Sequence, residues 1–315
     1  MNQAQRGWWN GMLGVVIFSG SLPATRAAVL DFDPVFLTLA RATIAGLLAA
    51  CLLLLGKQKR PSRGQLFSLA IVAGGVVVGF PLFTALALQH ITAAHSIVFI
   101  GLLPLATAIF AVVRGGERPS LCFWLFSFLG SSLVVGFAVA HGVSASPAGD
   151  ALMLAAIIVC GLGYAEGARL SRALGGWQVI SWALVISLPI MFPLALIEMP
   201  VSLADVGPYG WIGLAYVSLF SMFIGFVFWY RGLALGGTAA VGQLQLLQPF
   251  IGLVLAGTFL HEQISGRMIA VTAGIILCVA GAKKFLASCT NEFVAYRKAV
   301  LLSAAARLQD VRLLQ

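Results

Sequence analysis

The fold of this 315-residue chain is decided by a stretch of sequence that occurs twice. Residues 85–120 read ALALQHITAAHSIVFIGLLPLATAIFAVVRGGERPS, and residues 232–265 read GLALGGTAAVGQLQLLQPFIGLVLAGTFLHEQIS. A proline, a glutamate and a serine recur at one offset of 145 residues. The pairs are Pro104 and Pro249, Glu117 and Glu262, and Ser120 and Ser265. This repetition indicates two copies of one structural unit.

The composition predicts an all-α integral membrane protein. The chain is 60% hydrophobic and 9% charged, with a mean hydropathy of +1.01, whereas a soluble domain is roughly 25% charged. Short polar breaks separate apolar runs of about 20 residues, which is the length of a helix that crosses a bilayer. The net charge of +9 does not indicate nucleic acid as a partner, because the basic residues lie between the apolar runs and form no stripe. The expected partner is the lipid bilayer.

Ten transmembrane helices are expected, organised as two inverted five-helix repeats. The repeats would occupy residues 1–143 and 144–287, and residues 288–315 would form a basic cytoplasmic tail. Because five is odd, the second repeat enters the bilayer upside down relative to the first. The expected spans are roughly 8–30, 34–55, 65–88, 93–113, 121–141, 149–171, 177–197, 209–230, 238–260 and 265–287.

The distribution of Lys and Arg predicts the orientation, since cytoplasmic segments collect them. With the N-terminus inside, sixteen of the nineteen basic residues fall in inner segments, and Arg26, Arg41 and Arg267 are the remainder. Both termini are therefore expected on the cytoplasmic side of the cell inner membrane. An inverted repeat of this kind provides two related conformations, each open to one side, so alternating access around a midplane site is the expected mechanism.

A resemblance to a known family rests on a set of short motifs. They are Pro104 with Gly116-Glu117-Arg118; Gln248-Pro249-Phe250 with Glu262-Gln263-Ile264-Ser265; Gly274 and Gly281; and Pro34 with Arg41 and Ala45. Over residues 8–287 the chain resembles the drug/metabolite transporter superfamily, specifically its ten-span branch with two EamA-type domains. The resemblance implies efflux or exchange of small metabolites such as amino acids, without an organic cofactor, and leaves the substrate open.

No cofactor or metal is expected from the motifs. The five cysteines show no paired spacing, and His261-Glu262-Gln263 lacks the second histidine of a zinc-protease helix, because Ser265 stands there. No phosphate-binding glycine loop is present, so a proton gradient or substrate exchange would supply the energy.

Paired helix breaks are the first site candidates. A proline inside a span removes one backbone hydrogen bond, which would free the carbonyls of Ile100 at Pro104 and of Gln245 at Pro249. The freed carbonyls either contact a substrate or are satisfied by neighbours. In the ninth span Gln245 and Gln248 lie three residues apart, so they share a helix face and are candidates to line a polar cavity.

Two intramembrane charges are further candidates. Glu166 either couples transport to protons or contacts substrate, or it is a structural partner of Arg169 one turn away. Arg41 lies about 10 Å into the second span, and either attracts a carboxylate substrate or is anchored near the outer interface. His95, Ser96 and Tyr230 complete the candidate substrate-binding residues.

The predicted function is a secondary transporter that exports amino acids or related small polar metabolites. Two alternatives belong to other classes. A non-transporting membrane scaffold or sensor would keep the same repeat. A membrane-embedded enzyme acting on lipid substrates would need acids, histidines or metal ligands gathered at one membrane face, and in this sequence the acids are few and scattered.

Overall fold

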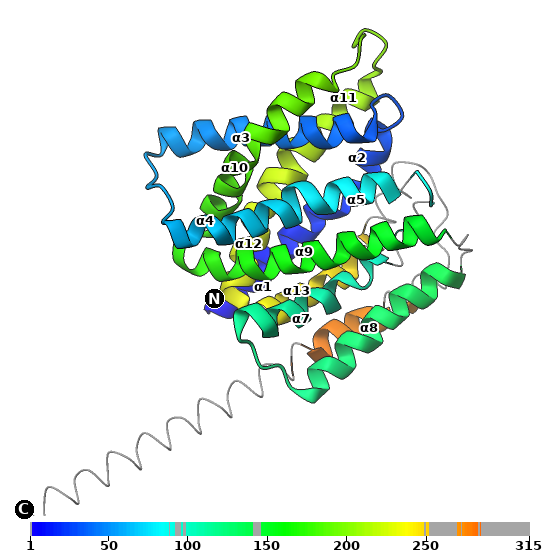
Figure 1. The fold of residues 1–315 in the computed structure, drawn as a ribbon. Helices are drawn as coiled ribbons and strands as arrows, with labels where there is room; N and C mark the ends of the chain where they lie inside the picture. The colour runs from blue at the N-terminus through cyan, green and yellow to red at the C-terminus, as the bar shows by residue number, and fades with distance from the viewer. Residues whose placement is uncertain are drawn as a thin grey trace, which may run out of the picture.

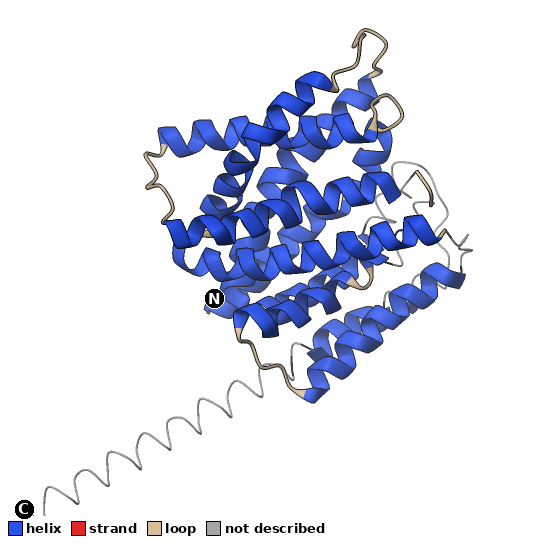
Figure 2. Ribbon diagram, in the orientation of Figure 1, coloured by secondary structure: helices blue, strands red, loops and turns tan. Residues whose placement is uncertain are grey.

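The computed structural model describes residues 2–87, 89–91, 96, 99–140, 146–248, 250–251, 270–271, 273–282 and 284. These residues form helices and the turns between them, with no strand in the described ranges (Figures 1 and 2). The α-helices are α1 (Gln3–Ser19), α2 (Ser21–Ala28), α3 (Pro34–Leu55), α4 (Arg63–Val72), α5 (Phe80–Ala87), α7 (Leu103–Gly115), α8 (Leu121–Ala140), α9 (Pro147–Leu174), α10 (Gly176–Ile197), α11 (Pro208–Ala215), α12 (Gly225–Gly236) and α13 (Thr238–Gly242). Two π-helical segments, η1 (Ala73–Gly79) and η2 (Tyr216–Ile224), and the 3-10 helix η3 (Gln243–Leu247) connect some of them.

Five continuous helical segments are long and apolar enough to cross a membrane. They are 34–55, 63–87, 147–174, 176–197 and 208–236, and shorter apolar helices cover 103–115, 121–136 and 273–282. The described part of the chain is thus helical, as expected, and has several segments suited to cross a membrane. The expected count of ten spans and the inverted repeat stay predictions. The basic tail at 288–315 lies outside the described residues.

The start of the chain differs from the expected span at 8–30. Helix α1 begins at Gln3, because Asn2 and Gln5 form a capping box in which each side chain accepts a hydrogen bond from the other's backbone N–H. The helix then ends at Gly20, where a short turn leads to α2. A Cβ atom at Gly20 would collide with the Tyr216 hydroxyl, so the absent side chain lets η2 pack closely against this turn.

Helix α3 begins where the sequence predicts a span, at Pro34. The Asp33 carboxylate accepts hydrogen bonds from the backbone N–H groups of Val35 (2.8 Å) and Phe36 (3.2 Å). Pro34 occupies the first turn, where its missing N–H costs no intrahelical bond. Local chemistry alone therefore fixes this boundary.

The two π-helical segments lie inside two long spans. Segment η1 joins α4 to α5, and η2 joins α11 to α12. Gly75 in η1 meets Gly163 of α9, where a Cβ atom at Gly163 would lie 3.4 Å from the Gly75 Cα. This approach of two glycines brings α9 against the irregular part of the third span.

Most helix pairs in the bundle join the first part of the chain to the second. Helix α1 packs on α12 and α3 packs on α10. In the same way α9 packs on α4, η1 and α5, and α13 packs on α7. The bundle in Figure 1 is thus intertwined, and neither half of the sequence forms a core by itself.

Charged residues lie at both ends of the bundle. One end, called the basic end below, holds the α3–α4 turn, the α7–α8 turn and the C-terminal end of α9. The opposite, acidic end holds Asp31, whose carboxylate accepts a hydrogen bond from the Gly207 N–H at 3.1 Å and ties the α2–α3 turn to the loop before α11. In Figure 1 the α3–α4 turn lies at the left of the bundle and the α10–α11 loop at the top right.

Candidate functional site

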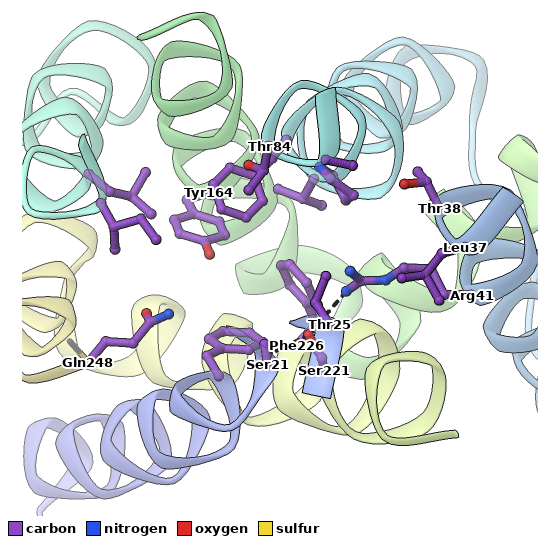
Figure 3. Close-up of a pocket in the computed structure, with 17 residues that line it drawn as sticks. Ser21, Thr25, Leu37, Thr38, Arg41, Thr84, Tyr164, Ser221, Phe226 and Gln248 are labelled. Carbon is purple, nitrogen blue, oxygen red and sulfur yellow. Dashed lines mark hydrogen bonds between the residues drawn. The ribbon is translucent and has the colours of Figure 1, made fainter. Parts of the chain in front are cut away.

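A pocket of about 80 Å³ lies between helices from both parts of the chain (Figure 3). From residues 1–143 it is lined by side chains of α1, α2, α3, η1, α5 and α7. From residues 144–287 it is lined by α9, η2, α12 and Gln248. Its lining residues are Phe18, Ser21, Thr25, Leu37, Thr38, Arg41, Val76, Phe80, Pro81, Thr84, Ala85, Ile100, Leu103, Tyr164, Ser221, Phe226 and Gln248.

Arg41 is the one charged residue among these described lining residues. Its Nη2 atom donates a hydrogen bond to the Ser221 Oγ at 3.1 Å, and the Ser21 hydroxyl donates to the same oxygen at 2.8 Å. The Arg41 Nε atom is buried and has no hydrogen-bond partner in the described part of the chain. The guanidinium is therefore held at the pocket wall by a neutral partner (Figure 3).

Aromatic rings form another wall of the pocket. Phe18 and Phe226 meet edge to face with ring centroids 5.0 Å apart, and Tyr164 lies 6.0 Å from Phe226. The Tyr164 hydroxyl points toward the pocket interior in Figure 3. Sequence reasoning missed Tyr164, although a phenol in the middle of the apolar sixth span was a usable signal.

The two glutamines of the ninth span lie in different surroundings. Gln248 lines the pocket and approaches it from the side opposite Arg41 (Figure 3). Gln245 is fully buried outside the pocket lining. Its amide lies beside the Tyr164 hydroxyl but makes no hydrogen bond of normal geometry to a described residue. Of the two glutamines, only Gln248 is therefore a lining residue of the pocket.

The remaining candidate substrate-binding residues either do not line the pocket or lie outside the described residues. Tyr230 is buried, and its hydroxyl donates a hydrogen bond to the Gly163 carbonyl at 3.2 Å. Its ring occupies the space that a side chain at Gly167 would need. Ser96 is buried as well and does not line the pocket. His95 lies outside the described residues.

Pro104, the first helix-break candidate, lies just after an interruption of helix within the expected span 93–113. It occupies the first turn of α7, after a turn at residues 101–102. The missing N–H of proline falls where a helix has no intrahelical acceptor, so the position suits it. The second helix-break candidate, Pro249, lies outside the described residues.

Glu166 is buried at the basic end between two arginines. Its carboxylate accepts a hydrogen bond from the Arg114 Nε at 3.0 Å and another from Arg169, whose Nη2 also donates to the Ser68 Oγ at 2.8 Å. Arg114 ends α7, and Ser68 belongs to α4. The predicted pairing with Arg169 is present, and the structure adds a second cation from 52 residues away.

Glu117 forms a second junction at the basic end. Its two carboxylate oxygens accept hydrogen bonds from the backbone N–H groups of Thr238 (2.8 Å) and Ala239 (2.9 Å), the first residues of α13. Arg172 of α9 donates to the same carboxylate at 3.1 Å. A carboxylate at a helix N-terminus satisfies unpaired N–H groups and complements the helix dipole. Glu117 thus binds the α7–α8 turn to α9 and α13.

Within the described ranges, no group of three or more His, Cys, Asp or Glu side chains is arranged to hold an ion.

The sequence profile of the EamA-like transporter family matches residues 5–137 and again residues 147–283. The chain therefore belongs to the EamA-like transporter family. It is 65% identical over 285 residues to an uncharacterized transporter, YdeK, of Bacillus subtilis, covering 90% of this chain and 99% of that one.

Two more distant proteins are also similar to this chain. An uncharacterized transporter of Archaeoglobus fulgidus is 24% identical over 254 residues, covering 80% of this chain and 88% of the relative. A protein of known crystal structure superposes with a TM-score of 0.74 at 19% identity, over 88% of this chain and 97% of that one. At this identity the likeness concerns the fold alone. The family and the two relatives indicate a transporter in a membrane, not an enzyme.

Proposed function

We propose that this protein is a secondary transporter that moves small polar metabolites by alternating access, exporting amino acids or related compounds. Its place would be the cell inner membrane, with both termini in the cytoplasm. The pocket carries the proposal. It is lined from both sequence repeats and presents hydroxyl, amide and guanidinium groups inside an otherwise apolar bundle, as expected of a transporter site at a repeat interface.

The pattern of helix packing supports an inverted repeat. If α1 corresponds to α9, α3 to α10, α5 to α12, and η1 to η2, then exchanging the halves turns several of the observed packings into other observed ones. The packing of α1 on α12 becomes that of α9 on α5, and α3 on α10 becomes itself. The π-helical segments η1 and η2 are about 143–145 residues apart, close to the offset of the sequence markers. Paired helix irregularities of this kind are typical of transporters with two conformations.

The junctions at the basic end support closure on that side. Along α9, Tyr164 faces the pocket, and the next turns toward the basic end carry Glu166, Arg169 and Arg172, all in ion pairs. These pairs connect α7 and the α7–α8 turn with α9 between the pocket and the basic end. The conformation would then be closed toward the cytoplasm, and substrate release to that side would require these ion pairs to open.

Flux measured with purified protein in proteoliposomes tests the proposal. Liposomes loaded with labelled amino acids should release them faster than protein-free liposomes. Gln248→Ala should raise the apparent KM because Gln248 lines the pocket, whereas Gln89→Ala, at an exposed glutamine, should leave it unchanged. Flux with the same KM in both variants would reject this pocket as the site. The absence of flux for any tested metabolite would favour a scaffold or sensor.

A further inference from the structure

The pocket holds a positive charge that no described acid neutralises. All ion pairs between described residues lie at the basic end, and none includes Arg41. None of the described lining residues is Asp or Glu. Arginine stays protonated under physiological conditions. The pocket therefore has a net charge of +1 from its described side chains.

An uncompensated cation deep in a membrane protein is costly. Isolated buried charges are paired, hydrated or used for function, because desolvation is not otherwise repaid. Ser221 contributes only a dipole to Arg41, and the Nε atom contributes no bond to any described residue. The missing counter-charge is thus expected from whatever occupies the pocket.

Hydroxyl groups around Arg41 are arranged to help hold an anion. The Ser221 Oγ accepts from both Arg41 and Ser21, so its own proton is left to donate. Thr84, which also lines the pocket, has a buried hydroxyl without a hydrogen-bond partner among described residues. A guanidinium with neighbouring hydroxyl donors suits the planar geometry of a carboxylate.

The rest of the pocket suits the uncharged part of a ligand. Phe18, Phe226 and Tyr164 present rings, and Gln248 presents an amide on the side opposite Arg41. A zwitterionic ligand would bring an ammonium group for which the described lining residues hold no carboxylate. Its zero net charge would also leave the +1 of Arg41 uncompensated, whereas a monoanion would neutralise it.

We propose that Arg41 is the cationic subsite of this pocket, and that the preferred ligand is a small organic monoanion bound by its carboxylate, in preference to a zwitterion. The anion subsite rests on the proposed function and narrows it, because the substrate would be a carboxylic acid related to an amino acid but without its ammonium group. The volume of about 80 Å³ suits a short-chain acid and lies well below the roughly 300–1,000 Å³ of sites for drug-sized ligands.

A series of compounds with one body and different charges tests the proposal. The series is 3-methylbutanoate (anion), valine (zwitterion), valinamide (cation) and 3-methylbutanamide (neutral). Binding is measured at pH 7 as the shift in melting temperature of the purified protein in detergent, in a buffer free of carboxylates and chloride and again after chloride is added. The parent should bind 3-methylbutanoate at least about 10-fold more tightly than valine, because the ammonium group of valine would lose its hydration without meeting a carboxylate among the described lining residues.

Variants assign the effect to Arg41. Arg41→Gln should lose about 10- to 100-fold in affinity for 3-methylbutanoate, and Arg41→Lys should retain part of it because the charge remains. Arg231→Gln removes an exposed arginine outside the pocket and should bind like the parent. If Arg41→Gln does not fold, Arg41→Lys and Ser221→Ala carry the comparison, and both should weaken binding of the anion.

Several results would overturn the anion subsite. They are valine binding as tightly as 3-methylbutanoate, equal binding of the anion by Arg41→Gln, no shift with 3-methylbutanoate in the parent, and a chloride effect that saturates the site so that the organic anion adds nothing. The proposed function fails separately. If labelled valine is transported with the same KM by parent and Arg41→Gln, the proposed transport function is supported and the anion subsite is rejected. If the anion binds through Arg41 but no flux is measured, the anion subsite is supported and the transport function is rejected.

Discussion

At the scale of single residues, the two intramembrane charges predicted from the sequence have opposite surroundings. Glu166 is buried between Arg114 and Arg169, so its charge is balanced within the protein. Arg41 contacts the hydroxyl of Ser221, and no described acid pairs with it. The difference favours a structural role for Glu166 and a ligand-binding role for Arg41.

Replacing Glu166 by Gln should destabilise the protein. The change leaves two arginines without their counter-charge, and we expect the free energy of unfolding to fall by about 1–3 kcal/mol. A fully buried pair would cost more, but the Arg114 and Arg169 side chains are 37% and 47% exposed. Thermal unfolding in detergent measures the effect, and Glu198→Gln, at an exposed acid, is the matched control.

Transport by Glu166→Gln decides between the structural role and proton coupling. A coupling residue held in its protonated form would lose gradient-driven efflux while keeping substrate exchange. If Glu166 is structural, efflux and exchange should change together, in proportion to the amount of folded protein. Loss of efflux alone, at unchanged thermal stability, would contradict the structural assignment.

At the scale of elements, Glu117 connects the α7–α8 turn to its neighbours at the basic end. This carboxylate caps α13 and pairs with Arg172 of α9, so one side chain joins three segments. The sequence repeat marks Glu117 and Glu262 as equivalent, but only the tertiary structure reveals what Glu117 contacts. Glu262 lies outside the described residues.

Glu117→Gln should loosen this junction. The amide can accept a hydrogen bond, but it loses one acceptor oxygen and the charge that favours the helix N-terminus, at a cost of about 1 kcal/mol. More molecules should then open at the basic end. The buried Cys160, one turn from Tyr164 on α9, reports the opening by faster maleimide labelling in a variant whose other four cysteines are replaced by Ser.

The control for this experiment is Asp205→Asn, which removes an exposed acid from the loop before α11. It should label at the parent rate, because it leaves the basic end untouched. A rate for Glu117→Gln no faster than that of the control would mean that Glu117 does not hold this end closed.

At the scale of the whole molecule, the arrangement of α4 and α9 predicts the membrane topology. Ser68, near the start of the helical span 63–87, contacts Arg169, near the end of α9, so this span and α9 run antiparallel. Ser62 and Ser146, which precede them, therefore lie at opposite ends of the bundle, separated by a helix of about 1.5 Å per residue. Cysteines introduced at the two positions should react with an impermeant maleimide from opposite sides of the membrane.

Ser62→Cys, in the basic α3–α4 turn, should react only after permeabilisation of the cell, and Ser146→Cys should react in intact cells. A cysteine-free parent provides the background. Reaction of both positions from the same side would refute the topology and with it the inverted repeat. If Ser62→Cys reacted in intact cells and Ser146→Cys only after permeabilisation, the fold would be retained but the predicted orientation in the membrane would be reversed.

The sequence by itself determined the class of protein and many helix boundaries. The length of an apolar run and the need to satisfy backbone hydrogen bonds in lipid are local properties, so membrane helices can be recognised from the sequence alone. The spans expected at 34–55 and 177–197 correspond to α3 and α10, which begin at Pro34 and Gly176. The motifs also sufficed to recognise the family that the profile match confirms.

Only the tertiary structure decided which residues meet. Arg41 donates a hydrogen bond to Ser221, which lies 180 residues away in the sequence, and Glu166 accepts one from Arg114, which lies 52 residues away. Tyr164 faces the pocket, whereas Gln245 does not line it. A helix that is apolar all round carries no amphipathic stripe to mark its inner face, so which side chains face the pocket, a neighbouring helix or lipid is set by packing between distant segments.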